Sequence, residues 1–478
     1  MYEHESRPDL RQKKYIQMTT MPVEKLVTKL ALPTIASMLV TALYNMADTY
    51  FVSSVGSGSD GTNAIAAVSL AFSVMAIIQA FGFFIGQGSA NYISRALGGQ
   101  DTEKASEMAA TGLFCALVVG LVITLVGELL LEQIAWLLGA HDRALLAPAT
   151  EYLRWIFAAA PVMTCSFCLN NQLRFQGNAV YAMIGVVSGA LLNVGLDPLL
   201  IHRFGMGVEG ASVATCISQS VGFCILLGGT FRGDNLRIHP RRIRINRENL
   251  SQIARGGLPS LLRQGFNSVS VMVLNLAAGQ VGAAMPHMGE AAVIAAFGLV
   301  SKIMTVANFV AIGMGQGYQP VCGFNYGAGL YRRVKNAFWF LVKASFVWCA
   351  LVTLAGELGA KQILGLFSDT EEKVRLLSEQ ILRLQCATFL VNCWVMPANM
   401  TQQTIGWSKS ASILAAARQG MFLIPLVLVL PRFFGLTGIE LCQPISDLLT
   451  LFLAIPLQVA VLRHFRQAEA ARLQEVQP

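Results

Sequence analysis

The sequence predicts an all-α polytopic membrane protein with twelve transmembrane helices in two six-helix bundles. Three observations lead to this fold class: a composition poor in charge, a series of apolar segments long enough to cross a bilayer, and a resemblance between the two halves of the chain. The bundles are expected to be parallel repeats, related by a pseudo-two-fold axis along the membrane normal.

The composition excludes an ordinary soluble protein. Of the 478 residues, 54% are hydrophobic and 13% are charged, and the mean hydropathy is +0.55. Soluble domains carry roughly 25% charged residues, so this chain has about half the usual share. The ten cysteines lie in or beside apolar segments and indicate no disulfide framework.

Twelve segments are apolar over about 20 residues, the length that crosses the hydrocarbon core of a bilayer as a helix. Strands of a membrane barrel would be about half as long and would alternate in polarity. The expected spans are 30–54, 64–90, 107–129, 152–173, 179–201, 209–230, 257–281, 291–321, 337–358, 380–402, 411–433 and 440–462.

The distribution of Lys and Arg predicts the orientation. Most of these residues fall on the side of the membrane that holds both termini, including the run RIHPRRIRIN at 237–246. Because cytoplasmic loops carry the excess of positive charge, we expect both termini in the cytoplasm of a cell whose inner membrane holds the protein. The opposite loops carry fewer basic residues: Arg143, Arg203, Lys361, Lys373 and Arg432.

The two halves of the chain resemble each other. IAAVSLAFSVMAIIQAFGFFIGQG at 65–88 aligns with IAAFGLVSKIMTVANFVAIGMGQG at 294–317, an offset of 229. Two bundles of six spans that enclose a central cavity and rock against each other are the architecture of an alternating-access transporter. The expected divisions are a cytoplasmic N-terminal segment 1–29, an N-lobe 30–230, a cytoplasmic linker 231–256, a C-lobe 257–462 and a cytoplasmic tail 463–478.

Of the few acidic residues within the expected spans of the N-lobe, two lie away from the span ends, Asp48 and Asp197. An acid in a transmembrane segment is a functional candidate because its insertion into lipid is costly. Two carboxylates close together in a low dielectric do not both stay ionised cheaply, so such a pair can take up and release a proton. Tyr44 and Asn193 lie four residues before these acids, on the same helix faces. Thr215 adds a neutral hydroxyl.

Two alternatives stay open for this group. Na⁺ can use the oxygens of Asp48, Asn193 and Asp197 in place of a proton. A structural role is also possible, with a buried Asp bonded to the backbone at a helix kink. Pro33 is expected to kink the first helix, and Pro198 follows Asp197 directly.

The spans of the C-lobe carry bases instead: Arg263, Lys302, Lys343 and Arg418. Asp447 is their main acid, so ion coupling is expected in the N-lobe. Arg263 and Arg418 can bind anionic groups of a substrate. The alternative is that they snorkel to the interface or pair with the backbone and with Asp447.

Several stretches together resemble the multidrug and toxic compound extrusion (MATE) family. They are YNMADTYFVSSVG (44–56), GFFIGQGSANYISRALGGQD (82–101), LNVGLDPLLI (192–201) and GQGYQPVCGFNYGAG (315–329). The resemblance covers all twelve spans. It implies export of amphipathic, cationic drugs or dyes by antiport against H⁺ or Na⁺, with a cation site at Asp48, Asn193, Asp197, Thr215 and Tyr44.

The pattern resembles the branch of the family with an N-lobe aspartate site. A second branch uses acids in helices seven and ten, where this chain has Arg263, Gln264 and Asn267, and Glu379 at an outer end. The substrate cavity is expected to be lined by Asn170, Arg263, Gln264, Asn267, Met272, Met304 and Met396. For any single methionine, the alternative is an ordinary lipid-facing or core position.

Other functional classes fit less well. All six His lie outside the spans or at their ends, and no H-E-x-x-H motif is present, so we expect no enzyme and no cofactor. GMGQG at 313–317 follows an apolar helix rather than a βαβ unit, and nucleic acid is not expected as a partner. The expected partners are small-molecule drugs or dyes and membrane lipids, bound by a monomer. A lipid-linked oligosaccharide flippase of the same superfamily is the alternative function.

Overall fold

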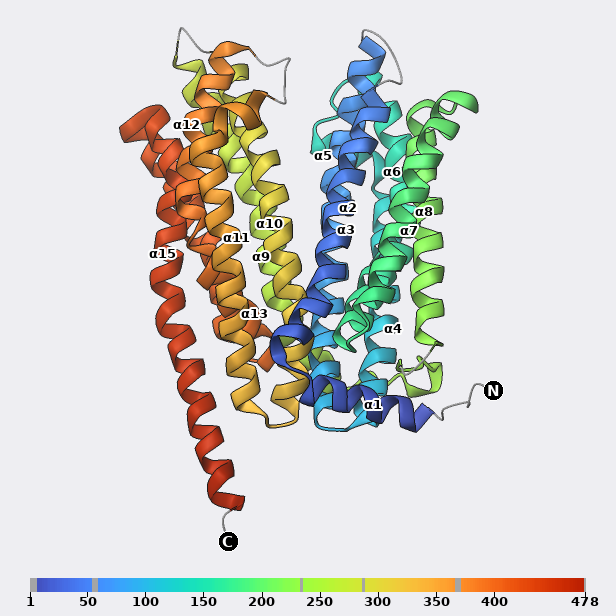
Figure 1. Ribbon diagram of the computed structural model, residues 1–478. Helices are drawn as coiled ribbons and strands as arrows, with labels where there is room; N and C mark the ends of the chain where they lie inside the picture. The colour runs from blue at the N-terminus through green and yellow to red at the C-terminus, as the bar shows by residue number, and fades with distance from the viewer. Residues whose placement is uncertain (1–6, 54–58, 233–234, 286–288, 366–370, 477–478) are drawn as a thin grey trace.

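Figure 1 shows the computed structural model, in which two bundles of helices stand side by side. They meet at the end of the molecule that carries both termini, here called the terminus end, and diverge toward the opposite, far end. The structure describes residues 7–53, 59–232, 235–285, 289–365 and 371–476, with the side chains of 7–10, 45–53, 59–65, 143–144, 473 and 475–476 left aside. These ranges form helices and contain no strand, which confirms the predicted fold class.

The first bundle follows a short helix, α1 (Arg7–Thr20), that lies across the terminus end (Figure 1). Its helices are α2 (Val23–Ser53), α3 (Ser59–Gly98), α4 (Thr102–Leu129), α5 (Leu131–Leu138), α6 (Arg143–Phe175), α7 (Ala179–Pro198) and α8 (Gly207–Thr230). A π-helical turn (Leu199–Arg203) separates α7 from α8.

The second bundle begins after a 3₁₀ turn (Pro240–Arg242). Its helices are α9 (Arg247–Ala283), α10 (Glu290–Gly327), α11 (Tyr331–Gly365), α12 (Glu372–Phe389), α13 (Asn392–Ile405), α14 (Ser408–Ala416) and α15 (Leu423–Val476). A second π-helical turn (Ala417–Phe422) joins α14 to α15.

The described helices account for twelve membrane crossings. Ten are long and apolar enough to cross by themselves, and α12 with α13 makes an eleventh crossing that is bent by 55°. One of the ten, Ser408–Arg472, crosses twice because Gly435 leaves helical geometry at φ 55° and ψ −127°. An unbroken helix would separate Arg418 from Asp447 by roughly 44 Å, yet an ion pair of 2.7 Å joins them.

The bend between α12 and α13 was not expected. The sequence predicts one span over 380–402, but Leu390 and Val391 separate two helices there. The break contains neither Pro nor Gly, and Pro397 lies further on, inside α13. Local sequence therefore gives no signal for this bend.

The predicted repeat is visible in individual hydrogen bonds. Asn170 Nδ2 donates to the carbonyl of Ala182 at 3.0 Å, and Asn399 Nδ2 donates to that of Ala411 at 2.8 Å. Both members of the second pair lie 229 residues after those of the first. The same offset relates two threonine bonds, Thr124 to the carbonyl of Phe157 and Thr353 to that of Cys386. The two halves are thus folded alike.

Each bundle has its own apolar core. In the first, Ile78, Tyr152 and Ile156 are fully buried among their neighbours. In the second, Phe297 and Leu382 occupy comparable places. Large apolar side chains also cover the outside, as expected where the solvent is lipid rather than water; among them are Leu125, Leu199, Leu358, Phe433 and Phe452.

Glycines allow the bundles to touch backbone to backbone near the terminus end. A Cβ atom at Gly257 of α9 would lie 1.9 Å from the carbonyl oxygen of Phe84 on α3. One at Gly317 of α10 would lie 2.3 Å from the Cα of Ala31 on α2. No side chain fits at either position. The contacts α3–α9 and α2–α10 are related by the repeat, so they close this end symmetrically.

Arginines add polar contacts at the same end by capping the carboxyl ends of helices. Arg95 of α3 donates to the carbonyl of Thr404 in the last turn of α13, across the two bundles. Arg333 donates to Met21 after α1, at 2.6 Å, and Arg472 donates to Gly329 after α10. A cation near the carbonyl end of a helix is also favoured by the helix dipole. Basic residues counted for orientation therefore also stabilise the closed end.

Candidate functional site

A cavity of about 380 Å³ lies between the two bundles. Residues of α2, α3, α6, α7 and α8 form most of its wall, and α9 and α10 of the second bundle complete it. Its position at the interface of the two repeats is where transporters of repeated architecture hold their substrates.

The cavity wall is aromatic and amide-rich. Phe83 and Phe167 lie against each other with ring centroids 5.4 Å apart, and methionines adapt the wall to different shapes. Among the described lining residues, the one with a formal charge is Arg263. The wall also contains further methionine, amide and phenylalanine side chains: Met38, Met75, Met163, Gln79, Asn170, Gln219, Gln264, Gln316, Phe72 and Phe309.

A buried polar group lies directly behind this wall, between α7 and α8. Asn193 Nδ2 is 3.3 Å from Thr215 Oγ1 and 3.4 Å from Asp197 Oδ1. With the amide turned over, Nδ2 donates to Asp197 Oδ2 at 3.2 Å and Oδ1 accepts the backbone N–H of Thr215 at 3.3 Å. Asn193 and Thr215 line the cavity, and Asp197 is 0% exposed. The carboxylate is one side chain away from the cavity.

Small residues bring the two helices close enough for these contacts. A Cβ atom at Gly189 of α7 would lie 3.1 Å from the carbonyl oxygen of Ser218 on α8. One at Gly222 of α8 would lie 3.1 Å from that of Gly185. Beyond Asp197 the helix ends at Pro198 and continues as the π-helical turn. Such turns are often found at functional sites.

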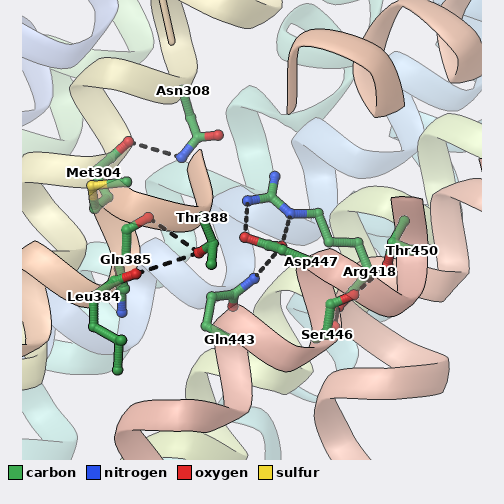
Figure 2. Close-up of polar contacts among 10 residues, drawn as sticks. All are labelled: Met304, Asn308, Leu384, Gln385, Thr388, Arg418, Gln443, Ser446, Asp447 and Thr450. Atoms are coloured by element: carbon green, nitrogen blue, oxygen red, sulfur yellow. Dashed lines mark hydrogen bonds and ion pairs between the residues drawn. The ribbon is translucent and has the colours of Figure 1, made fainter. Parts of the chain in front are cut away.

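The second bundle holds a different polar group on the corresponding helices (Figure 2). Arg418, in the π-helical turn after α14, donates through Nε to Asp447 Oδ1 of α15 at 2.7 Å, and Nη2 is 3.4 Å from Oδ2. Gln443 Nε2 donates to the same carboxylate at 2.9 Å. Ser446 Oγ donates to the carbonyl of Arg418. The charge of Asp447 is therefore balanced within the protein.

Comparison with known proteins identifies the chain. A protein-family model described as MatE matches residues 33–199 and 259–429, one stretch in each half. The chain belongs to this MATE family.

Relatives and solved structures agree with the family assignment. The multidrug export protein MepA of Staphylococcus aureus is 28% identical over 421 residues, which are 87% of this chain and 89% of that protein. The protein of the same name from Staphylococcus haemolyticus is 27% identical over 454 residues, which are 95% of this chain and 97% of that protein.

Two solved structures have a TM-score of 0.86 and 26% identity, over 94% of this chain and 98% of theirs. One is a MOP superfamily transporter from Pyrococcus furiosus. The other is a multidrug resistance MATE transporter in an outward-facing conformation.

In this MATE chain, the expected ion-coupling residues fall into two sets. Asn193, Asp197 and Thr215 lie together, and Tyr44 lines the same cavity from α2. Asp48 lies on α2, but its side chain is outside the described residues. The helix α2 is continuous through Pro33, where the sequence predicts a kink. The described residues contain no group of three or more His, Cys, Asp or Glu that would hold a metal.

Of the seven residues expected to line the cavity, three do so and four do not. Asn170, Arg263 and Gln264 line the cavity. The other four lie elsewhere: Asn267 is exposed, Met272 is 65% exposed, Met304 lies in the core of the second bundle, and Met396 lies against Gly315.

Sequence reasoning missed a polar contact between the bundles of this MATE fold. Arg174 of α6 is fully buried and donates through Nη1 to Gln316 Oε1 of α10 at 2.7 Å, and through Nη2 to Asn171. Gln316 belongs to the Gly-Gln-Gly motif and also lines the cavity. The repeated motif was the available signal, because Gln87 occupies the matching place in α3 and donates to Asn171 at 3.0 Å.

Proposed function

We propose that the chain is a secondary active multidrug exporter, which moves amphipathic drugs or dyes out of the cell by antiport against H⁺ or Na⁺. The family assignment and the relatives named as multidrug export proteins support export of small molecules. The cavity between two bundles supports alternating access. This is a transport role, with no chemical step required of the protein.

The orientation belongs to the same proposal. The terminus end carries most of the basic residues of the loops, so it faces the cytoplasm of a cell whose inner membrane contains the monomer. The bundles touch at this end and diverge at the far end (Figure 1). The described conformation is then the one that is open to the outside.

Ion coupling is proposed for Asp197, with Asn193, Thr215, Tyr44 and Asp48. The observation that carries it is the complete burial of the Asp197 carboxyl group directly behind the cavity wall. Burial makes the ionised form of a carboxyl group costly, which favours uptake of a proton or cation and its exchange when the site opens to water. Asn193 offers either a donor or an acceptor through its amide, and so suits both charge states of the carboxyl group.

The antiport cycle follows from competition for this group. An ion from the outside neutralises Asp197 while the cavity faces outward, and the drug leaves. Neutralised side chains lower the cost of bringing the bundles together at the far end. The cavity then opens to the cytoplasm, the ion leaves, and a drug molecule binds in its place.

Asp197→Asn tests the coupling. Purified protein in lipid vesicles is given a pH gradient, and uptake of ethidium is followed by fluorescence. Wild type and the control Glu132→Gln, which neutralises an exposed acid of the same bundle away from the cavity, should transport the dye. Asp197→Asn should lose gradient-driven transport while still binding ethidium. Transport by this variant at the wild-type rate would show that the assignment is wrong.

The coupling ion is distinguished in the same vesicles. If H⁺ is the coupling ion, a Na⁺ gradient imposed without a pH gradient should not drive dye transport above the level seen with no gradient. Transport that requires the Na⁺ gradient and ignores a pH jump would identify Na⁺ instead.

A further inference from the structure

Arg263 is a cation in the cavity wall that the proposed transport cycle does not use. It lies on α9 of the second bundle and is the one charged residue among the described lining residues. The aromatic and amide groups around it need no counter-ion. Its presence in a largely apolar cavity therefore calls for an explanation, because an unbalanced guanidinium is costly there.

Arg263 differs from Arg418 and Arg174 in what balances its charge. Arg418 forms an ion pair with Asp447 at 2.7 Å. Arg174 is fixed by hydrogen bonds to Gln316 and Asn171. Arg263 has one long hydrogen bond, from Nη1 to Asn399 Oδ1 at 3.4 Å, and no carboxylate within ion-pair distance among the described residues. Most of its donors remain available to a molecule in the cavity.

We propose that Arg263 binds the carboxylate of zwitterionic amphiphiles, and that these are preferred over plain cations of the same size. The proposal rests on the proposed export function. A guanidinium offers two parallel N–H donors that match a carboxylate, and the low dielectric of the cavity strengthens the pair. The acidic group around Asp197 lies in the opposite bundle, so a zwitterion would place its positive end toward α7 and its negative end toward α9.

Matched dyes test the charge preference at equilibrium. Rhodamine B carries a free carboxylate and a delocalised cation, whereas rhodamine B ethyl ester is a cation without the carboxylate. Binding of each to detergent-purified protein is measured by fluorescence polarisation. Wild type should bind rhodamine B about tenfold more tightly than the ester, the difference expected of one charge-assisted contact.

Substitutions locate the preference. Arg263→Gln keeps an amide donor for Asn399 but removes the charge. It should therefore weaken the binding of rhodamine B about tenfold and change the affinity for the ester by no more than about twofold. Arg263→Lys should keep part of the preference. Gln264→Ala, which alters the neighbouring lining residue without a change of charge, should affect both dyes alike.

Three results would overturn the proposal. They are tighter binding of the ester than of rhodamine B by wild type, an equal loss of affinity for both dyes in Arg263→Gln, and no binding of either dye by wild type. The wild-type comparison decides the matter even if a variant does not fold. Failure of the coupling scheme is recognised separately. Asp197→Asn would then transport like wild type in vesicles, while the ratio of the two dye affinities is measured without any gradient.

Discussion

At the scale of single residues, the two bundles treat a buried carboxyl group in different ways. Asp197 meets the neutral amide of Asn193, whereas Asp447 meets the guanidinium of Arg418 and the amide of Gln443. A carboxylate with a permanent cationic partner has little use for an exchangeable ion. Asn193 and Arg418 thus give the two halves different polar groups on a repeated fold.

A second residue-scale feature is the cap at the start of α4. The carboxylate of Asp101 accepts the backbone N–H of Lys104 at 3.0 Å and lies 3.3 Å from its Nζ. The first of these contacts is the main reason why the pKa of Asp101 is lowered from its ordinary value. A carboxyl group with a lowered pKa stabilises the fold above the pKa of the unfolded chain, about 3.9, and loses this effect as the pH falls through the folded value.

We therefore predict that Asp101→Ala lowers the melting temperature at neutral pH, through a loss of about 1 kcal/mol typical of such caps. The difference from wild type should shrink when the pH is lowered below 4, because wild type then loses the same interaction. Asp101→Asn, which still caps the helix, is the control. A difference that persists unchanged at acidic pH would contradict the role of the charge.

At the scale of helices, the glycines of the crossing between α3 and α9 control the closed terminus end. We predict that Gly257→Ala destabilises the closed arrangement, since its Cβ atom would lie 1.9 Å from the carbonyl oxygen of Phe84. Overpacking of this kind costs about 1–3 kcal/mol. The melting temperature should fall, and spin labels at exposed Lys104 and Lys409, in opposite bundles, should move apart.

Gly265→Ala provides the matched control on the same helix. No atom lies within 4 Å of the position of its Cβ, so the change should be neutral or slightly stabilising through helix propensity. Equal effects of the two alanines would show that the close crossing has no part in holding the bundles together.

At the scale of the whole molecule, transport requires the bundles to separate at the terminus end. We predict that a disulfide-containing cross-linker between Lys104→Cys and Lys409→Cys, matched in length to the closed arrangement, stops transport because it ties the two bundles together at this end. Both positions are exposed, so the substitutions leave the glycine crossings intact. Dye binding should survive, and a reducing agent should restore transport. Single-cysteine variants treated with the same cross-linker should transport normally, and transport by the cross-linked protein would contradict alternating access.

The features that could be predicted from the sequence are those that lipid imposes on every residue of a segment. A span must be apolar over its whole length, so the twelve crossings could be predicted from the sequence. The repeat could be predicted from the aligned segments of the two halves. The bend after Phe389 could not, because the break contains neither Pro nor Gly. Within the site, Asn193 was placed beside Asp197 by the four-residue spacing of one helix face.

Which residues line the cavity depended on helix rotation, which composition does not reveal. Met272 follows Arg263 by two and a half turns and therefore points to the opposite side, where it is exposed. Met304 lies on a helix that does line the cavity, but its sulfur faces Cys386 at 3.8 Å in the core. The pairing of Arg418 with Asp447 was one of two alternatives in the sequence, and the reversal at Gly435 decides between them.

The ion pair of the second bundle bears on the energetics of the proposed antiport. If Arg418 satisfies Asp447 throughout the cycle, the number of ions exchanged per drug molecule is bounded by the carboxyl groups of the first bundle. A zwitterionic drug has no net charge, so a single proton exchanged for it at 100 mV supplies about 2.3 kcal/mol. That energy sustains a concentration ratio of roughly fifty across the membrane. Steeper accumulation would require a larger pH difference or a second proton, and the stoichiometry of a reconstituted exporter would reveal which it uses.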